Sequence, residues 1–306
     1  MMRRRTGLVA LGAALAVLVA GCSSPDDTAA PTSSPSESTP SPTMTVAAYD
    51  AEFAALEAEF GSRIGVYAID TGGGGEIAYR ADERFAYAST FKALAAAAVL
   101  QQSDPADLER VVTYSSDELI THSPVTELNV ESGMTLGALA EAAVRVSDNT
   151  AGNLLLEELE GPAGFTERLA AIGDDVTQAV RWEAGLNDGV PGDPRDTTSP
   201  RAFATDLREF VVGDALSAEK RELLVDWMSG NATGDTLIRA GVPSDWVVAD
   251  KSGSGGYGVR NNIAVVWPPD RDPIVLAVLT TRDSPDAARD DAVVARAAAI
   301  VADSLK

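Results

Sequence analysis

Ser89 and Lys92 form a pair of side chains that could carry out covalent catalysis. They lie three residues apart at the start of an alanine-rich run, residues 89–100, that favours a helix. On a helix this spacing places the hydroxyl and the amine on one face, and the first N–H groups can face a carbonyl oxygen. A desolvated lysine can take the serine proton, so the pair could attack an amide. About one such match is expected by chance in a chain of this length, so an N-cap serine with a solvated lysine is the alternative.

A second motif could supply a proton to the leaving group. Ser147, Asp148 and Asn149 form a tripeptide that by itself is more typical of a helix cap or a turn. Beside an activated serine it gains a second interpretation. The hydroxyl of Ser147 could pass a proton to the leaving nitrogen, and the amide of Asn149 could hold a carbonyl of the substrate.

A third motif is suited to an anionic substrate. Lys251, Ser252 and Gly253 come at the end of an expected strand, and Ser254 follows them. An ammonium, two hydroxyls and an unobstructed backbone could bind a substrate that lies alongside that strand. Arg260, on the adjoining strand, could add a guanidinium to the same carboxylate.

The fourth motif is a loop whose carboxylate could hold a water molecule. It contains Arg181, Trp182 and Glu183, followed by Asn187. Together the four motifs predict acyl transfer from an amide, followed by hydrolysis. The chain has four lysines and two of them occupy motif positions, which chance placement explains poorly.

The elements that must position these residues are segregated along the chain. Hydrophobic spacing and turn residues predict a helix over 49–60, a hairpin from 64–70 and 76–80, strands over 246–251, 262–267 and 274–281, and a helix over 285–305. Residues 88–228 are dominated by helical patterns and long loops. We therefore expect an α+β fold of two lobes: a five-stranded antiparallel sheet flanked by N- and C-terminal helices, and an inserted, mostly helical lobe. The active site is expected in the cleft between the lobes.

Composition excludes several classes of function. The chain has 306 residues, 45% of them hydrophobic, and a formal charge of −22, so it should fold and should not bind nucleic acid. It contains one cysteine and one histidine, which excludes an intramolecular disulfide and argues against a zinc hydrolase site. We expect no metal and no cofactor.

The N-terminus predicts export and a lipid anchor. Residues 1–21 resemble a signal peptide, with three arginines before an apolar run of 13 residues that is too short to span a bilayer. The run ends at Cys22 in a sequence that resembles a bacterial lipobox; an ordinary signal peptide with an incidental cysteine is the alternative. Residues 22–43, rich in Ser, Pro and Thr, are expected to form a disordered tether after the lipidated cysteine. The protein would then sit on the outer face of the cytoplasmic membrane or elsewhere in the cell envelope.

With these motifs in one order, the chain resembles a class A serine β-lactamase over roughly residues 46–306. Three of the motifs belong to the wider superfamily of penicillin-recognising enzymes. The fourth, residues 181–188 continuing through 195–198, resembles the Ω-loop of class A and is the discriminating element. The resemblance implies a catalytic domain over residues 44–306, with an α/β lobe at about 44–86 and 229–306 and a helical lobe at about 87–228.

The resemblance also implies a role for each motif residue. Ser89 would be the nucleophile, Lys92 and Glu183 the two candidate bases for acylation, and Glu183 with Asn187 the holders of the deacylating water. The implied proton donor to the leaving nitrogen is Ser147, tuned electrostatically by Lys251. The implied ligands of the substrate are Ser252, Ser254 and Arg260 for its carboxylate, Asn149 for its acylamide side chain, and the backbone N–H groups of Ser89 and Ser254 for the oxyanion.

Other positions would support the site or depart from the family pattern. The resemblance implies that Arg181 and Asp196 pin the Ω-loop and that Asn153 supports Glu183. His122 occupies the position where an aromatic side chain usually stacks against the substrate, and we expect it to form a wall of the cleft. Ala184 follows Glu183 where many members have proline, after a peptide bond that is often cis.

The resulting hypothesis is a membrane-tethered monomeric enzyme that hydrolyses penicillins and cephalosporins through a Ser89 acyl-enzyme and so confers antibiotic resistance. One alternative is a penicillin-binding D,D-peptidase, which would share three motifs but lack the loop that carries Glu183. Another is a lipoprotein that captures β-lactams or cell-wall peptides as a sensor without hydrolysing them. The intact set of Ser89, Lys92 and Glu183 argues against the sensor.

Overall fold

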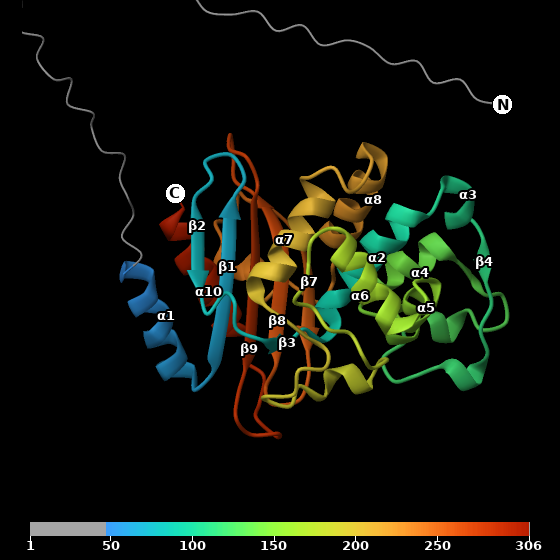
Figure 1. Ribbon diagram of the computed structural model, residues 1–306, viewed down its shortest axis with the longest axis horizontal. Coiled ribbons are helices and arrows are strands. Elements are labelled where there is room, and N and C mark those ends of the chain that lie inside the picture. Colours follow the sequence, from blue (N-terminus) through green and yellow to red (C-terminus); the bar gives the residue numbers. More distant parts are fainter. Residues whose placement is uncertain (1–46, 306) are drawn as a thin grey trace, which may run out of the picture. The chain divides into compact units, whose positions relative to one another are not determined.

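The structure of this protein is a computed structural model that describes residues 47–305. The expected signal peptide, the lipidated Cys22 and the tether over residues 22–43 lie outside the described residues. Figure 1 shows the folded body, with strands near its middle and helices on both sides of them. Within residues 47–305, no helix has both the length and the apolar character needed to cross a membrane.

Five antiparallel strands form the central sheet, in the order β2-β1-β9-β8-β7. They are β1 (Arg63–Asp70), β2 (Glu76–Tyr79), β7 (Val247–Ser254), β8 (Arg260–Trp267) and β9 (Ile274–Thr281). The sheet brings together segments that are far apart in the sequence, because β1 pairs with β9 along the whole length of β1. The predicted sheet of five antiparallel strands is therefore confirmed.

The sheet separates two hydrophobic cores, because successive side chains on a strand point to opposite faces. Val66 and Val278, paired across β1 and β9, belong to the core under the terminal helices. Their neighbours Tyr67 and Ala277, also paired, belong to the core of the helical lobe. Both faces of the sheet are thus covered, which explains why its central strands are almost wholly apolar.

The terminal helices cover one face of the sheet. They are α1 (Ala47–Phe60) and α10 (Asp291–Ser304), which pack against each other. Helix α10 also packs against the short α9 (Ile238–Gly241). The prediction of an N-terminal helix is confirmed. The prediction that the last helix begins near Pro285 is wrong: it begins at Asp291, where Asp290 caps it by accepting a hydrogen bond from the backbone N–H of Ala292 at 3.0 Å. Residues 285–290 are a loop instead.

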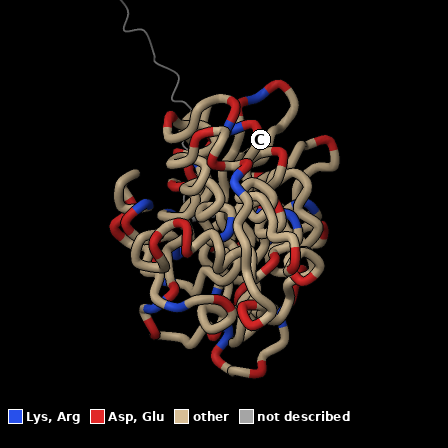
Figure 2. The backbone as a smooth tube through the Cα atoms, turned by 90° about the vertical axis from the view of Figure 1, so that its right-hand side faces the viewer, with Lys and Arg blue, Asp and Glu red and all other residues tan. Residues whose placement is uncertain are grey.

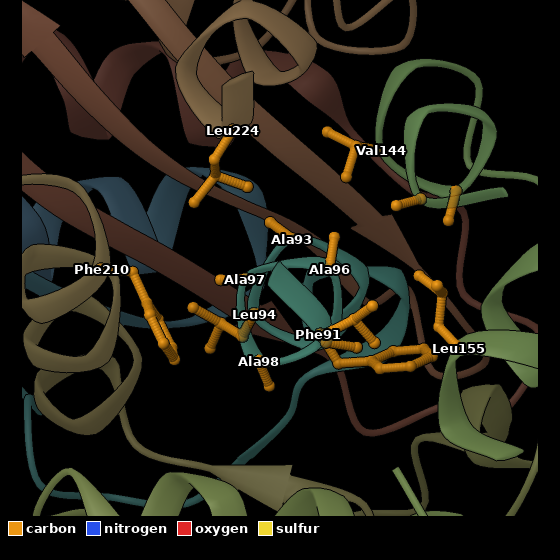
Figure 3. Packing of buried hydrophobic residues seen from close by; sticks show 14 of the residues in the cluster. Phe91, Ala93, Leu94, Ala96, Ala97, Ala98, Val144, Leu155, Phe210 and Leu224 are labelled. Atoms are coloured by element: carbon orange, nitrogen blue, oxygen red, sulfur yellow. The ribbon is translucent and has the colours of Figure 1, made fainter. Parts of the chain in front are cut away.

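The helical lobe is built around α2 (Phe91–Gln102), whose residues from Phe91 to Leu100 are all buried. A helix that is apolar on all sides belongs in a core, and small alanine side chains let its neighbours approach closely. Figure 3 shows Leu94 and several of these alanines surrounded by Val144, Phe210 and Leu224. The other helices of the lobe are α3 (Pro105–Leu108), α4 (Leu136–Arg145), α5 (Asn149–Glu158), α6 (Gly161–Ala171), α7 (Pro200–Val211) and α8 (Ala218–Ser229).

Short elements connect the lobe to the sheet. Two small antiparallel pairs are formed by β3 (Phe85–Ala86) with β6 (Thr197–Thr198) and by β4 (Val111–Val112) with β5 (Met134–Thr135). Four 3₁₀ turns complete the described elements: η1 (Ala88–Thr90), η2 (Ser116–Glu118), η3 (Thr126–Leu128) and η4 (Gly185–Asp188). The β3–β6 pair matters most for function, because it ties the segment before Ser89 to the end of the loop that carries Glu183.

Candidate active site

Ser89 lies in η1, directly before α2, and is held there by contacts from the sheet. The side-chain amide of Asn261, on β8, donates to the carbonyls of Ala86 at 2.7 Å and Tyr87 at 3.2 Å. The turn bends sharply because Ala88 has a φ of 47°. Lys92 follows one helical turn later, so the predicted pairing of these side chains is present: Lys92 Nζ donates to Ser89 Oγ at 3.1 Å.

Glu183 completes a three-residue cluster with Ser89 and Lys92. Its Oε1 accepts a hydrogen bond from Ser89 Oγ at 3.1 Å and lies 2.8 Å from Lys92 Nζ. The side chains of Lys92 and Glu183 are both fully buried. Each charge therefore has a close opposite partner in a site from which water is largely excluded, which is the condition under which buried ions are tolerated.

Lys92 also reaches across to the second motif. Its ammonium donates to the carbonyl of Ser147 at 3.0 Å and to Asn149 Oδ1 at 2.5 Å, and its Nζ lies 3.5 Å from Ser147 Oγ. Burial lowers the pKa of Lys92, although the nearby charge of Glu183 opposes this by favouring the ammonium. A lysine with a lowered pKa that touches two serine hydroxyls can move protons between them.

The second motif is positioned by a buried carboxylate. Asp148 caps α5 by accepting from the N–H of Ala151 at 2.9 Å, and its other oxygen accepts from the N–H groups of Val125 and Thr126, each at 3.0 Å. Its role as a cap, expected from the sequence, is thus combined with anchoring the neighbouring loop. Ser147 beside it adopts a φ of 60°.

The loop that carries Glu183 is closed by an ion pair. Arg181 Nε lies 2.5 Å from Asp196 Oδ2, and the other carboxylate oxygen of Asp196 accepts from the N–H groups of Val180 at 2.8 Å and Arg181 at 2.9 Å. Asp196 is fully buried. Residues 181 and 196 therefore pin the two ends of the loop together, as the resemblance implied.

Glu183 itself is held on both sides of its backbone. Asn153 Oδ1 accepts from the N–H of Glu183 at 2.9 Å, and Asn153 Nδ2 donates to its carbonyl at 3.2 Å. The peptide bond between Glu183 and Ala184 is cis. Asn187 Nδ2 donates a short hydrogen bond to Glu183 Oε2, so the two proposed water-holding side chains are in contact.

The third motif lies within β7, which extends past the predicted end at Lys251 as far as Ser254. Lys251 is fully buried and donates to the carbonyl of Ser252 at 2.8 Å. Burial, followed by the nearby charge of Lys92, lowers the pKa of Lys251 well below its ordinary value. The hydrogen bonds of residues 47–305 include none between Lys251 and Ser147, so the tuning expected of Lys251 would act through its charge alone.

A cavity of about 430 Å³ opens in front of these residues. Of the residues that the sequence predicted for the site, those that line it are Ser89, His122, Ser147, Asn149, Asn187, Ser252, Ser254 and Arg260. Lys92, Glu183 and Lys251 are buried behind its wall. His122 is a wall residue, as expected, and its Nε2 lies 3.1 Å from the carbonyl of Val146. Among the described residues, no group of His, Cys, Asp or Glu could hold a metal ion.

Three residues of the site were missed by the sequence reasoning. Thr233 lines the cavity, and its Oγ1 lies 2.6 Å from Ser252 Oγ. Arg289 lines it from the loop that the sequence had predicted as helix. Gly152 makes room for Lys92, because a Cβ atom at this position would lie 2.7 Å from Lys92 Cε. Gly152 is five residues after Ser147, so the sequence could have suggested that the site needs a small residue there. Thr233 belongs to no motif, so nothing in the sequence near it indicated that it lines the site.

Known proteins resemble this chain along nearly all of its described length. The model of the β-lactamase enzyme family matches residues 48–305. The chain is 58% identical to a β-lactamase of Amycolatopsis lactamdurans over 258 residues, which is 84% of this chain and 85% of the relative. It is 48% identical to β-lactamase AST-1 of Nocardia asteroides over 305 residues, which is 99% of this chain and 96% of the relative.

Solved structures give the same result for the fold. The crystal structure of a class A β-lactamase from Clostridium kluyveri DSM 555 matches with a TM-score of 0.83 at 50% identity, covering 84% of this chain and 98% of the other. A β-lactamase from Streptomyces albus G matches with a TM-score of 0.81 at 45% identity, over 84% and 99% of the two chains. The chain therefore belongs to the class A β-lactamases, enzymes that hydrolyse β-lactam antibiotics and so confer resistance to them.

Proposed function

We propose that this protein opens the β-lactam amide in two steps, through an ester on Ser89. In the first step Ser89 Oγ adds to the lactam carbonyl carbon and the C–N bond breaks. In the second step water attacks the ester, releasing the ring-opened acid and restoring the serine hydroxyl. The observation that carries the proposal is that Ser89 Oγ lies 3.1 Å from both Lys92 Nζ and Glu183 Oε1.

Two groups can accept the proton of Ser89 during acylation. Lys92, whose pKa is lowered by burial, touches the hydroxyl directly, and so does the carboxylate of Glu183. The equal distances leave both bases in reach. The proton then needs a path to the lactam nitrogen, and Ser147 Oγ, 3.5 Å from Lys92 Nζ and exposed to the cavity, provides one. The same lysine can therefore link the hydroxyl that attacks to the hydroxyl that protonates the leaving group.

Deacylation depends on Glu183 and Asn187. An acyl-enzyme is a stable product unless water attacks it, and a buried carboxylate beside the ester oxygen is a suitable base. Asn187 lines the cavity and contacts Glu183, so a water held by the two side chains would lie next to Ser89. This pair distinguishes the proposed hydrolase from a D,D-peptidase or a sensor that would remain acylated.

Substrate binding follows the edge of β7. A β-lactam carries a carboxylate, and Ser252, Thr233 and Arg260 line the cavity with hydroxyl and guanidinium donors, the two hydroxyls 2.6 Å apart. The N–H groups of Ser89 and Ser254 are proposed to bind the developing oxyanion, which is the interaction expected to contribute most to the lowered barrier. Asn149 and His122 also line the cavity and are joined by a backbone hydrogen bond of 2.9 Å, and the acylamide side chain would lie beside them.

Intact mass spectrometry with a chromogenic cephalosporin tests these roles. Wild type should turn over, Ser89→Ala should neither turn over nor gain mass, and Glu183→Gln should accumulate one adduct on Ser89. The loss in kcat for Glu183→Gln should be about 10²–10⁴-fold, the range for a general base. A wild type that itself stalls as an adduct would instead support the penicillin-binding peptidase or the sensor.

We also propose that the protein is exported and acts as a monomer, anchored by a lipid on Cys22. The basis for export and the anchor is the sequence of residues 1–43: a basic start, a short apolar run, a cysteine and a polar stretch. Metabolic labelling with a fatty acid should mark the wild type and leave Cys22→Ser unmarked. A wild type that takes up no label, or a Cys22→Ser variant that is labelled as strongly as wild type, would refute the anchor.

A further inference from the structure

Arg289 brings a second guanidinium to the cavity that Arg260 also lines. It lies on the loop before α10 and is largely exposed. Its Nη1 donates to Ser254 Oγ at 2.9 Å, and its side chain lines the same cavity as Ser89. Ser254 therefore connects Arg289 directly to the region proposed to bind the substrate's carboxylate.

The other cations near the cavity are already compensated or withdrawn from it. Arg260 Nε lies 2.6 Å from Asp291 Oδ1, and Lys92 lies 2.8 Å from Glu183 Oε1. Lys251 is fully buried. Arg289, in contrast, forms none of the ion pairs found within residues 47–305. It is consequently an exposed positive charge at the mouth of the site with no carboxylate in ion-pair contact.

Asp291 responds to both guanidinium groups. Burial by itself raises its pKa, but hydrogen bonds from Arg260 and Thr236, together with the charges of Arg260 and Arg289, bring the pKa below its ordinary value. The carboxylate is therefore ionised when the enzyme works near neutral pH. Its hydrogen bonds go to Arg260 and Thr236, so Arg289 keeps its donors for Ser254 and for a ligand.

The positive charge of Arg289 matters for substrate binding because the protein as a whole is strongly negative. Acidic residues are spread along the backbone of the folded body, as Figure 2 shows, and the chain carries a formal charge of −22. A β-lactam substrate is an anion through its carboxylate, so the general surface repels it. A local positive charge at the mouth of a cleft can offset this repulsion and raise the rate of association by about tenfold or more.

We propose that Arg289 is a specificity residue that, together with Ser254, attracts β-lactams that are net anions and disfavours those with a cationic group beside the carboxylate. The proposal rests on the β-lactamase activity of this family and adds a substrate preference to it. In a cephalosporin the C3 substituent is next to the carboxylate at C4. A positive charge on that substituent would lie close to the Arg289 guanidinium and be repelled.

Two cephalosporins with the same acylamide side chain isolate this effect. Cephalothin has an uncharged acetoxymethyl group at C3 and is a monoanion, whereas cephaloridine has a pyridinium group there and is a zwitterion. The quantity to measure is kcat/KM for cephalothin divided by kcat/KM for cephaloridine. It is measured in about 10 mM salt, where the Debye length is about 30 Å, and in about 1 M salt, where it is about 3 Å. Arg289→Gln should lower the ratio about tenfold at low salt, chiefly through the KM of cephalothin, and by less at high salt.

Two variants provide the controls. Arg282→Gln removes the same charge from the same connection between β9 and α10, but Arg282 does not line the cavity, so its ratio should match wild type. Arg289→Lys keeps the charge and should retain most of the preference. An unchanged ratio in Arg289→Gln, or an equal fall in Arg282→Gln, would overturn the proposal. Failure of wild type to hydrolyse either compound would instead refute the proposed reaction, which is a different result.

Discussion

A buried pair of carboxyl groups outside the active site leads to a quantitative prediction about stability. Asp206, on α7, is 2% exposed, and its Oδ2 and the Oδ2 of Asp174 lack donors among the described residues. Asp174 Oδ1 is occupied by the N–H groups of Val176 at 2.7 Å and Thr177 at 3.0 Å. Two ionised carboxylates can only accept hydrogen bonds, whereas one proton between them lets Asp206 donate to Asp174.

The electrostatics place that proton on Asp206 at neutral pH. Burial, followed by the charge and hydrogen bond of Asp174, raises the pKa of Asp206 to about 10. An unfolded chain has an ordinary Asp with a pKa of about 3.9. Between these two values the folded state holds a proton that the unfolded state has released. The free energy of unfolding therefore falls as pH rises through this window, by about 1.4 kcal/mol per pH unit.

Asp206→Asn should remove this dependence. The amide has the shape of the protonated acid and can donate to Asp174 without binding a proton. Over the roughly three pH units between 3.9 and 7, the linkage amounts to about 4 kcal/mol, which is the upper limit of the stabilisation expected at pH 7. Below pH 4 the variant and the wild type should be equally stable, since the acid is then protonated in both states.

Equilibrium urea unfolding at pH 5, 7 and 9 measures this directly. The gap between Asp206→Asn and wild type should widen with pH, while Asp206→Ala, which leaves Asp174 without a donor, should be less stable than Asp206→Asn at every pH. Parallel pH profiles for wild type and Asp206→Asn would refute the reasoning, because they would show that Asp206 carries no proton linkage. Activity should be similar in the variant, as Asp206 does not line the active-site cavity.

Two further predictions concern the site. Gly152→Ala should lower kcat at least about tenfold with little change in KM, because the new Cβ would lie 2.7 Å from Lys92 Cε and displace the amine. Gly185→Ala is the matched control: its Cβ meets nothing within 4 Å, so kcat should stay near the wild-type value. Arg181→Ala should destabilise the protein by about 3 kcal/mol, because Asp196 remains buried without its cation. The same variant should accumulate acyl-enzyme in mass spectra, and turnover at the wild-type rate would show that the ion pair does not position the loop.

Much of the sheet and of the site could be predicted from the sequence, for physical reasons. Ser89 and Lys92 depend on helical spacing, which is local, so their contact at 3.1 Å was predictable. The strands near the two ends of the folded body are apolar runs bounded by turns, which favoured the prediction that they share one sheet, and β1 does pair with β9. The contact of Glu183 with these residues was different in kind. It spans 94 positions in the chain, and it could be anticipated only through the resemblance to a known family.

What could not be predicted depends on boundaries and on long-range polar contacts. Helical periodicity continues into residues 285–290, so the position at which α10 begins was misjudged, and with it the exposure of Arg289 to the cavity. Thr233 lines the cavity only because its loop returns to β7, where Ser252 Oγ lies 2.6 Å from Thr233 Oγ1. Asp206 looks like a solvated helix residue in the sequence, and only the fold shows that Asp174 is next to it.

The motif residues share a further physical property: a buried, hydrogen-bonded carboxylate lies next to or within each of three motifs. Asp148 organises the loop beside Ser147, Asp196 closes the loop of Glu183, and Asp250 is fully buried beside Lys251. Asp250 illustrates the principle, since its oxygens accept from Asn231 at 2.7 Å, Asn262 at 2.8 Å and Arg239 at 2.8 Å. The general requirement that buried charge be fully hydrogen-bonded makes each such carboxylate rigid. These rigid carboxylates hold side chains from distant parts of the chain within hydrogen-bond distance of one another around Ser89. Catalysis by preorganised charge requires such an arrangement.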